Sequence, residues 1–179
     1  ISLDPADFPF MTMREAHIAG LPVRIFRISF TGELSYEINI RARHGLALWT
    51  HLMKAGAEFG ITPYGTEAMH VLRAEKGFII VGQETDGSVT PQDLGMDWIV
   101  SKVKPDFIGK RALERTSMAA DNRKQLVGLR AKERKQVIPE GAHAVLDPNQ
   151  PMPMDMLGQV TSSYYSPNVG SSIAMAMLK

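Results

Sequence analysis

The alternation of apolar and polar residues between Val23 and Ile40 constrains the fold more than any other feature of the sequence. Val23–Phe30 alternates with a period of two, which is the side-chain period of a β-strand. Thr31-Gly32 follows as a turn signal, and Leu34–Ile40 alternates again. Two such runs around a glycine turn predict a β-hairpin. In its second strand, one face would carry Leu34, Tyr36, Ile38 and Ile40, and the other Ser35, Glu37 and Asn39.

Two carboxylates, Glu33 and Glu37, lie within this predicted hairpin, although acidic residues are uncommon in strands. Glu33 adjoins the turn, where an exposed side chain is expected. Glu37 has two interpretations that the spacing leaves open. It either faces water on an exposed strand face, or it presents two acceptor oxygens to a ligand with two parallel N–H donors. Guanidinium groups and 2-aminopyrimidinone rings offer such a donor pair.

Helical spacing predicts two helices after the hairpin. The first runs through HGLALWTHLMKAGAEF and stops at Gly60. Its apolar face would contain Leu46, Trp49, Leu52 and Met53. The second begins with Thr62 as its cap and Pro63 at its first position, and it ends before Gly77. Structural salt bridges are expected for its charged residues Arg73, Glu75 and Lys76.

Three further elements are predicted before residue 119. GFIIVGQ, residues 77–83, is typical of a short buried strand, and Thr90-Pro91 is a second helix-start signal. Residues 105–118 predict a closing helix. Trp98 follows the Thr-Pro signal, and its pattern favours core packing over stacking on a planar ring. The order strand, strand, helix, helix, strand indicates an α+β fold in which helices cover one face of a sheet.

Four short alternating segments, separated by Pro, Gly, Asn and Asp, make up the last third of the chain. They are KQLVGLRA, AHAVLD, LGQVTSSYY and SSIAMAML. Short strands at this spacing are typical of a small barrel or sandwich. The change in pattern predicts two domains, residues 1–118 and 119–179.

The sequence lacks the signatures of several functional classes. No apolar run approaches ~18 residues, which argues against a membrane span, and a net charge of +1 argues against a nucleic-acid surface. The absence of cysteine removes disulfides and thiolate chemistry. No phosphate loop, dinucleotide fingerprint or serine nucleophile elbow occurs, and the five histidines lack metal-ligand spacing. By elimination, we expect a binding element with no metal site and no self-sufficient catalytic centre.

The two ends of the sequence resemble cut ends. The chain starts at Ile1 without a lead-in and ends inside the alternating run SIAMAMLK. We therefore expect a fragment of a longer polypeptide, with a truncated C-terminal barrel. No signal-peptide pattern opens the sequence, and a cytoplasmic location is expected.

Several motifs occur in an order that resembles the aminomethyltransferase (glycine cleavage T-protein) superfamily of folate-binding domains. They are FPFMT at 8–12, R-x-x-RISFTGELSYEI at 24–38, LRAEKG at 72–77 and TPQDLGMDW at 90–98. FIGKRAL at 107–113 resembles the segment that leads to the family's C-terminal barrel. The resemblance covers nearly the whole chain. It implies part of a T-protein-like folate-binding domain, with an antiparallel sheet and helices on one face, followed by a small β-barrel.

SFTGELSYEINI and YGTEAMHVLRAEKGFIIVGQETDG look most similar to the α subunits of heterotetrameric sarcosine oxidases. This resemblance implies an oxidoreductase acting on CH–NH donors, in which tetrahydrofolate accepts the one-carbon unit from sarcosine to give 5,10-methylenetetrahydrofolate. The partners would be the rest of the α chain and the β, γ and δ subunits. FAD, FMN and NAD are expected elsewhere in the complex. The alternatives are an aminomethyltransferase of glycine cleavage, or a non-catalytic folate-binding or structural relative.

The resemblance also implies roles for individual residues. Glu37 corresponds to the family glutamate that binds the pterin ring, and Trp98 to a folate contact. Phe30 stands where a tyrosine is common and is the third expected binding residue. Met69 replaces a folate-binding arginine, so the folate tail is expected to be held differently. The family's catalytic aspartate would lie upstream of Ile1. No catalytic residue is therefore assigned, and the fragment alone is expected to be inactive.

Overall fold

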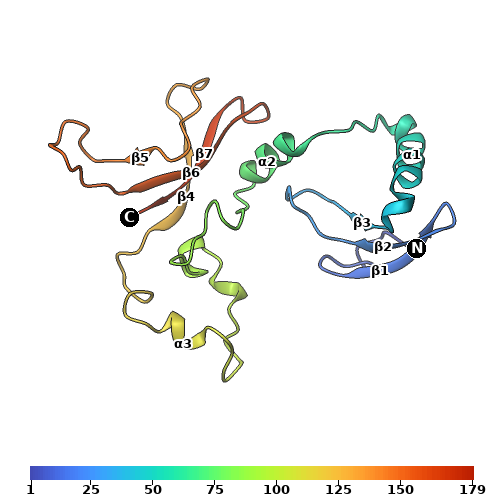
Figure 1. The fold of residues 1–179 in the computed structure, drawn as a ribbon, viewed down its shortest axis with the longest axis horizontal. Helices are drawn as coiled ribbons and strands as arrows, with labels where there is room; N and C mark the ends of the chain where they lie inside the picture. Colours follow the sequence, from blue (N-terminus) through green and yellow to red (C-terminus); the bar gives the residue numbers. More distant parts are fainter. The chain divides into compact units, whose positions relative to one another are not determined.

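The computed structural model describes residues 1–179, which form two compact units, residues 1–72 and 73–179. The first unit contains a three-stranded sheet and α1, and the second a four-stranded sheet that follows a segment of short helical turns (Figure 1). α2 crosses the division between the units. The predicted α+β class is confirmed. The predicted domain boundary between residues 118 and 119 stays a prediction.

The first sheet has the order β1-β2-β3, with all neighbours antiparallel. Its strands are β1 (Met13–Ile18), β2 (Leu21–Phe26) and β3 (Glu37–Asn39). The predicted hairpin is β2–β3, so that pairing is confirmed. β1 was not predicted, because the polar pair Arg14-Glu15 interrupts the alternation in its sequence MREAHI.

A loop of ten residues, 27–36, joins β2 to β3, so the predicted tight turn at Thr31-Gly32 and the strand end at Phe30 are wrong. After Phe26, the last residue of β2, the chain no longer pairs with β3. Arg27 pairs instead with the residues just before β1. The Arg27 N–H donates to the Thr12 carbonyl (3.0 Å), and the Met11 N–H donates to the Arg27 carbonyl (2.9 Å). Thr31 is buried in this loop.

The two faces of the first sheet differ sharply in polarity. One face packs around a buried cluster of Phe8, Val23 and Ile25. Partly buried residues that pack against this cluster are Ala16, Ile18, Tyr36, Ile38 and Ile40. The predicted facing of β3 is therefore confirmed, except that Leu34 lies in the loop and is 72% exposed. The opposite face is polar and open.

The first predicted helix is confirmed as α1 (Gly45–Gly56), extended by a 3₁₀ turn over Ala57–Phe59. Gly60 ends it in the left-handed conformation, with φ of 70°. Its buried face differs from the prediction, because Leu48 is buried whereas Leu46 and Trp49 are exposed. No helix in the structure combines the length and the apolar character that crossing a membrane requires.

The second predicted helix is α2 (Thr66–Glu75). The predicted start at Thr62-Pro63 is wrong, since residues 61–65 are not helical. The predicted end is confirmed: Gly77 has φ of 73°, its N–H donates to the Ala74 carbonyl (3.0 Å), and the Phe78 N–H donates to the Arg73 carbonyl (2.9 Å). This pair of bonds is a Schellman motif.

Replacing Gly77 by alanine is expected to destabilise the end of α2 by about 1 kcal/mol, because a Cβ disfavours the left-handed conformation. Faster amide hydrogen exchange in peptides covering residues 66–80 is the measurement. Gly87→Ala is the matched control, since Gly87 has no positive φ and a Cβ there meets no atom within 4 Å. Equal exchange in both variants would contradict this account of the helix end.

Two helices and a strand predicted between residues 77 and 118 are much shorter than expected or absent. GFIIVGQ forms a turn rather than a strand, and Val81 is 85% exposed. The Thr-Pro signal opens only two 3₁₀ turns, Gln92–Leu94 and Asp97–Ile99. The closing helix is reduced to α3 (Lys110–Leu113), because Gly109 adopts a φ of 97° immediately before it.

All four C-terminal strands are confirmed. They are β4 (Gln125–Arg130), β5 (His143–Ala144), β6 (Gly158–Ser166) and β7 (Ser171–Leu178). They form one antiparallel sheet with the order β4-β7-β6-β5. Val160, Ala174 and Ala176 form its buried core. The sheet is curled into a half-barrel, where the alternating segments predicted a small barrel or sandwich.

Candidate functional site

Glu37 lies on the open, polar face of the β1–β2–β3 sheet. It is exposed, opposite Phe26 in the register, and it forms no ion pair. Its Oε1 accepts one hydrogen bond, from Asn39 Nδ2 at 2.7 Å. Asn39 is two residues further along β3 and therefore shares the face. The Glu37 carboxylate is thus oriented by a neutral neighbour rather than neutralised by a cation.

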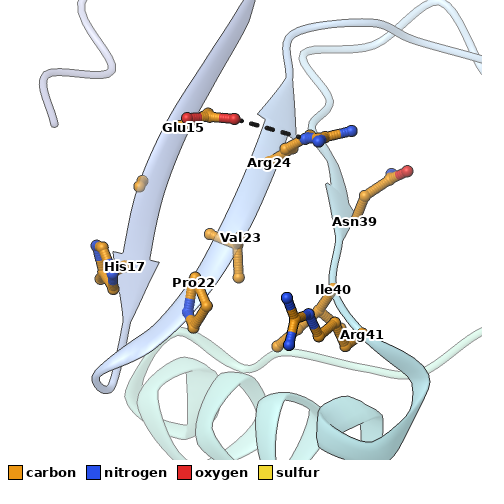
Figure 2. Close-up of a pocket in the computed structure, with 9 residues that line it drawn as sticks. Glu15, His17, Pro22, Val23, Arg24, Asn39, Ile40 and Arg41 are labelled. Atoms are coloured by element: carbon orange, nitrogen blue, oxygen red, sulfur yellow. Dashed lines mark ion pairs between the residues drawn. The ribbon is translucent and has the colours of Figure 1, made fainter.

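The rung next to Glu37 carries further charged groups. Antiparallel pairing places Asn39 opposite Arg24, and Arg24 opposite Glu15. Arg24 Nε lies 3.6 Å from Glu15 Oε1, and both side chains are mostly exposed. Figure 2 shows this ion pair across β1 and β2, with Asn39 on the neighbouring strand. An exposed pair of this kind contributes little to stability.

Phe30 and Trp98 are both accessible side chains. Phe30 lies in the loop after β2 and is 44% exposed. Trp98 lies in the 3₁₀ turn Asp97–Ile99 of the second unit and is 73% exposed, so core packing, which its pattern favoured, is wrong. Exposed aromatic rings of this kind can stack on a planar ligand. Met69 is half-buried on α2.

The Glu37 carboxylate fits the donor set of a pterin. A pterin presents its N3–H and 2-amino group side by side, and a carboxylate accepts such a pair through its two oxygens. Each oxygen carries more than one lone pair, so the Asn39 contact leaves acceptor capacity. No group of three or more His, Cys, Asp or Glu side chains is arranged to hold a metal ion. The free lone pairs of the Glu37 carboxylate are thus available to a pair of parallel N–H donors.

A separate, largely buried polar network lies in the second unit and centres on Arg73. Arg73 is 0% exposed, and its Nη1 lies 3.1 Å from Glu84 Oε2. Arg73 also donates to the Phe78 carbonyl and to the side chains of Gln83, Ser162 and Tyr164. Glu84 in turn accepts from the Ile80 N–H, Thr161 and Ser162. The predicted structural role of Arg73 is confirmed, whereas its partner Glu84 was not predicted.

A second ion pair joins Asp93, in the 3₁₀ turn Gln92–Leu94, to Arg123, which lies just before β4. Arg123 donates to both carboxylate oxygens of Asp93 and to the Ser88 carbonyl. The Thr90 N–H also donates to Asp93 Oδ2, at 2.7 Å. Burial acts to raise the pKa of Asp93, but the bonds from Arg123 and Thr90 outweigh it and lower that pKa. The bond to Asp93 raises the pKa of Arg123.

Two family models match the chain. The GCVT N-terminal domain matches residues 1–104, and the glycine cleavage T-protein C-terminal barrel domain matches residues 124–179. The matched regions include Glu37 and Trp98 in the first and β4 to β7 in the second.

Known proteins are similar over nearly the whole chain. The sarcosine oxidase subunit alpha of Corynebacterium sp. (strain P-1) is 51% identical over 96% of this chain and 18% of its own length. The aminomethyltransferase of Halothermothrix orenii is 34% identical over 95% of this chain and 45% of its own length. The crystal structure of the glycine cleavage system aminomethyltransferase T from Bartonella henselae superposes with a TM-score of 0.77 at 26% identity, covering 94% of this chain and 44% of that one. The chain thus spans less than half the length of each of these relatives.

Proposed function

Because the chain belongs to the glycine cleavage T-protein family, we propose that it binds a reduced folate through Glu37 as part of a sarcosine oxidase α subunit. The observation that carries the proposal is the state of Glu37. This carboxylate is exposed on a strand, unpaired with any cation and oriented by Asn39. The hydrogen bond from Asn39 fixes the orientation of the carboxylate, and a ring ligand with two parallel N–H donors needs an oriented acceptor pair.

Trp98 and Phe30 are proposed as further folate contacts. Both aromatic rings are accessible, which a stacking role requires. Tetrahydrofolate, when bound, accepts the one-carbon unit derived from sarcosine. The residues of this chain then bind and orient the ring. FAD, FMN, NAD and the β, γ and δ subunits belong, on this proposal, to the remainder of the complex.

The oxidase is favoured over the aminomethyltransferase of glycine cleavage by the degree of similarity. The sarcosine oxidase relative is 51% identical, against 34% for the aminomethyltransferase relative. Met69, half-buried on α2, also departs from the arginine expected in a T-protein. Formation of methylenetetrahydrofolate from sarcosine, rather than from the glycine-cleavage intermediate, is the activity that separates the two.

The proposal predicts that Glu37→Gln weakens folinic acid binding by about 10-fold or more, on the order of 1.4 kcal/mol. The substitution keeps the size of the side chain but places an amide donor against the donors of the ring. The measurement is calorimetric titration of folinic acid into the longest natural polypeptide that carries this sequence.

Glu58→Gln is the matched control, because Glu58 is an exposed glutamate of the same unit outside the sheet. It is expected to bind folinic acid like the wild type. Equal affinity of wild type and Glu37→Gln would refute the pterin role of Glu37. Absence of folinic acid binding to the wild type would favour a structural relative of the family.

A further inference from the structure

The loop between β5 and β6 carries three methionines at alternate positions, Met152, Met154 and Met156. The loop has no regular secondary structure and extends away from the paired strands (Figure 1). Met152 is 81% exposed, Met156 is 51% exposed, and Met154 is half-buried. Little of Met152 and only half of Met156 is removed from water, so packing against the sheet does not account for this run of methionines.

The three side chains share one ligand chemistry. A thioether sulfur is a neutral, soft and polarisable ligand, and soft sulfur ligands select Cu(I). Hard cations such as Mg²⁺ and Ca²⁺ take oxygen ligands instead. The chain contains no cysteine, and nowhere else in the sequence do three methionines alternate in this way. The expectation of no metal site rested on histidine, cysteine and carboxylate spacing, to which methionine does not contribute.

The spacing brings the three sulfurs within reach of one ion. Even in a fully extended chain, each residue advances by only about 3.3 Å, so alternate residues lie no more than about 7 Å apart. A methionine side chain is unbranched and has several rotatable bonds, so its sulfur can turn toward a point between its neighbours. Any bend of the chain shortens the span between the first and the third methionine further.

Gln150 bends this part of the loop into a closed arc. Its Nε2 donates to the Asp155 carbonyl (3.2 Å), and its Oε1 accepts from the Asp155 N–H (3.3 Å). The two bonds close the chain around the first two methionines and hold the backbone next to the third. At the base of the loop, the Leu157 N–H donates to the Ala144 carbonyl (2.8 Å). The methionines therefore lie on a fixed arc rather than on a free strand.

We propose that this loop binds one soft monovalent metal ion, Cu(I), through the sulfurs of Met152, Met154 and Met156. Gln150 is a positioning residue, because it holds the arc closed and offers no soft ligand of its own. The proposal does not depend on folate binding, since the loop belongs to the second unit and Glu37 to the first. It adds a metal site to the chain beside the proposed folate site.

Ag(I) has the charge and the softness of Cu(I) and is the first probe. Silver nitrate is titrated calorimetrically, in chloride-free buffer, into the longest natural polypeptide that carries this sequence. The triple variant Met152→Leu/Met154→Leu/Met156→Leu is expected to bind about one equivalent fewer than the wild type. Leucine keeps the size and apolar character of methionine and removes the sulfur. Met11→Leu is the matched control, because Met11 is 72% exposed and lies outside the loop; it should bind as many equivalents as the wild type.

Anaerobic competition with the Cu(I) chelator bicinchoninate gives the affinity for copper itself. Met154→Leu leaves two sulfurs and is expected to weaken Cu(I) binding by at least about 10-fold. Gln150→Ala should also weaken it, with the stoichiometry and the unfolding temperature of the wild type. Thioethers do not bind protons in this range, so the affinity should be constant between about pH 6 and pH 8, whereas a site that includes histidine weakens as its ring is protonated.

Two results would overturn the proposal. One is an equal number of Ag(I) equivalents in the wild type and the triple variant. The other is a Cu(I) affinity that falls as histidine is protonated, because an imidazole would then be a ligand. If the triple variant loses its circular dichroism signal, the single variant Met152→Leu, at the most exposed of the three positions, takes its place. Cu(I) affinity equal to that of the wild type in this variant would likewise refute the site.

Discussion

Replacing Arg73 by methionine is expected to destabilise the second unit by about 3–5 kcal/mol, because it leaves the buried Glu84 carboxylate without its cation. Both side chains of this pair are 0% exposed. Glu84 would keep its bonds from the Ile80 N–H and from Ser162, but these cannot offset a buried net charge. Amide hydrogen exchange in peptides of β6 and of residues 78–84 measures the loss.

The double variant Arg73→Met/Glu84→Met separates lost charge balance from lost packing. Apolar side chains of similar volume often replace a buried ion pair without loss of stability, so the double variant should recover most of the deficit. Lys102→Met is the control, because it removes an exposed pair with Asp97 at 3.8 Å that is worth at most about 1 kcal/mol. A loss from Arg73→Met no larger than that from Lys102→Met would show that the network does not hold the unit together.

The same network explains why one strand predicted from the sequence does not form. GFIIVGQ has the composition of a buried strand, but Glu84 accepts from the Ile80 N–H at 2.7 Å. The Gln83 and Glu84 N–H groups both donate to the Ile80 carbonyl. These bonds satisfy both backbone groups of Ile80 and the N–H groups of Gln83 and Glu84 within the turn, and they hold the segment in a shape that cannot pair as a strand. The Glu84 side chain, seven residues after Gly77, therefore determines the structure of this segment. The periodicity of apolar residues cannot predict such a side-chain contact.

The C-terminal strands were predictable because alternation and turn residues agree there. β6 and β7 are long, and most of their residues are buried. The short helical turns between residues 90 and 118 were not predictable from the sequence. A start signal such as Thr90-Pro91 determines only the first turn of a helix. Continuation requires an apolar face to bury. Ile99 and Ile108 are exposed in this region, so no such face supports longer helices.

One part of the candidate site could be predicted from the sequence, and another part could not. The facing of Glu37 follows from alternation within β3 alone, and the sequence was sufficient to predict it. The charged rung next to Glu37 depends on the register of three strands, which brings Glu15 opposite Arg24 and Arg24 opposite Asn39. Because β1 gives only a weak alternating signal, no reading of the sequence could place Glu15 and His17 in the same sheet as Glu37.

The second large effect is expected at Asp93, where Asp93→Asn should cost about 2–4 kcal/mol near neutral pH. The variant removes the charge that holds Arg123 and weakens the acceptor of the Thr90 N–H. Because the folded-state pKa of Asp93 is lowered, its contribution is fully present above the unfolded-state pKa of about 3.9. It is lost as the pH falls through the lower, folded-state value.

Urea unfolding of the polypeptide that carries this chain, followed by circular dichroism between about pH 7 and pH 2.5, tests both statements. The gap between wild type and Asp93→Asn should be constant at neutral pH and close only in the acid range below about pH 4. Asp121→Asn, at an exposed aspartate with no side-chain partner, should follow the wild type throughout. A gap that is unchanged down to the lowest pH would mean that the asparagine disturbs packing. The ion pair between Asp93 and Arg123 would then not be what fastens the 3₁₀ turn to the residues before β4.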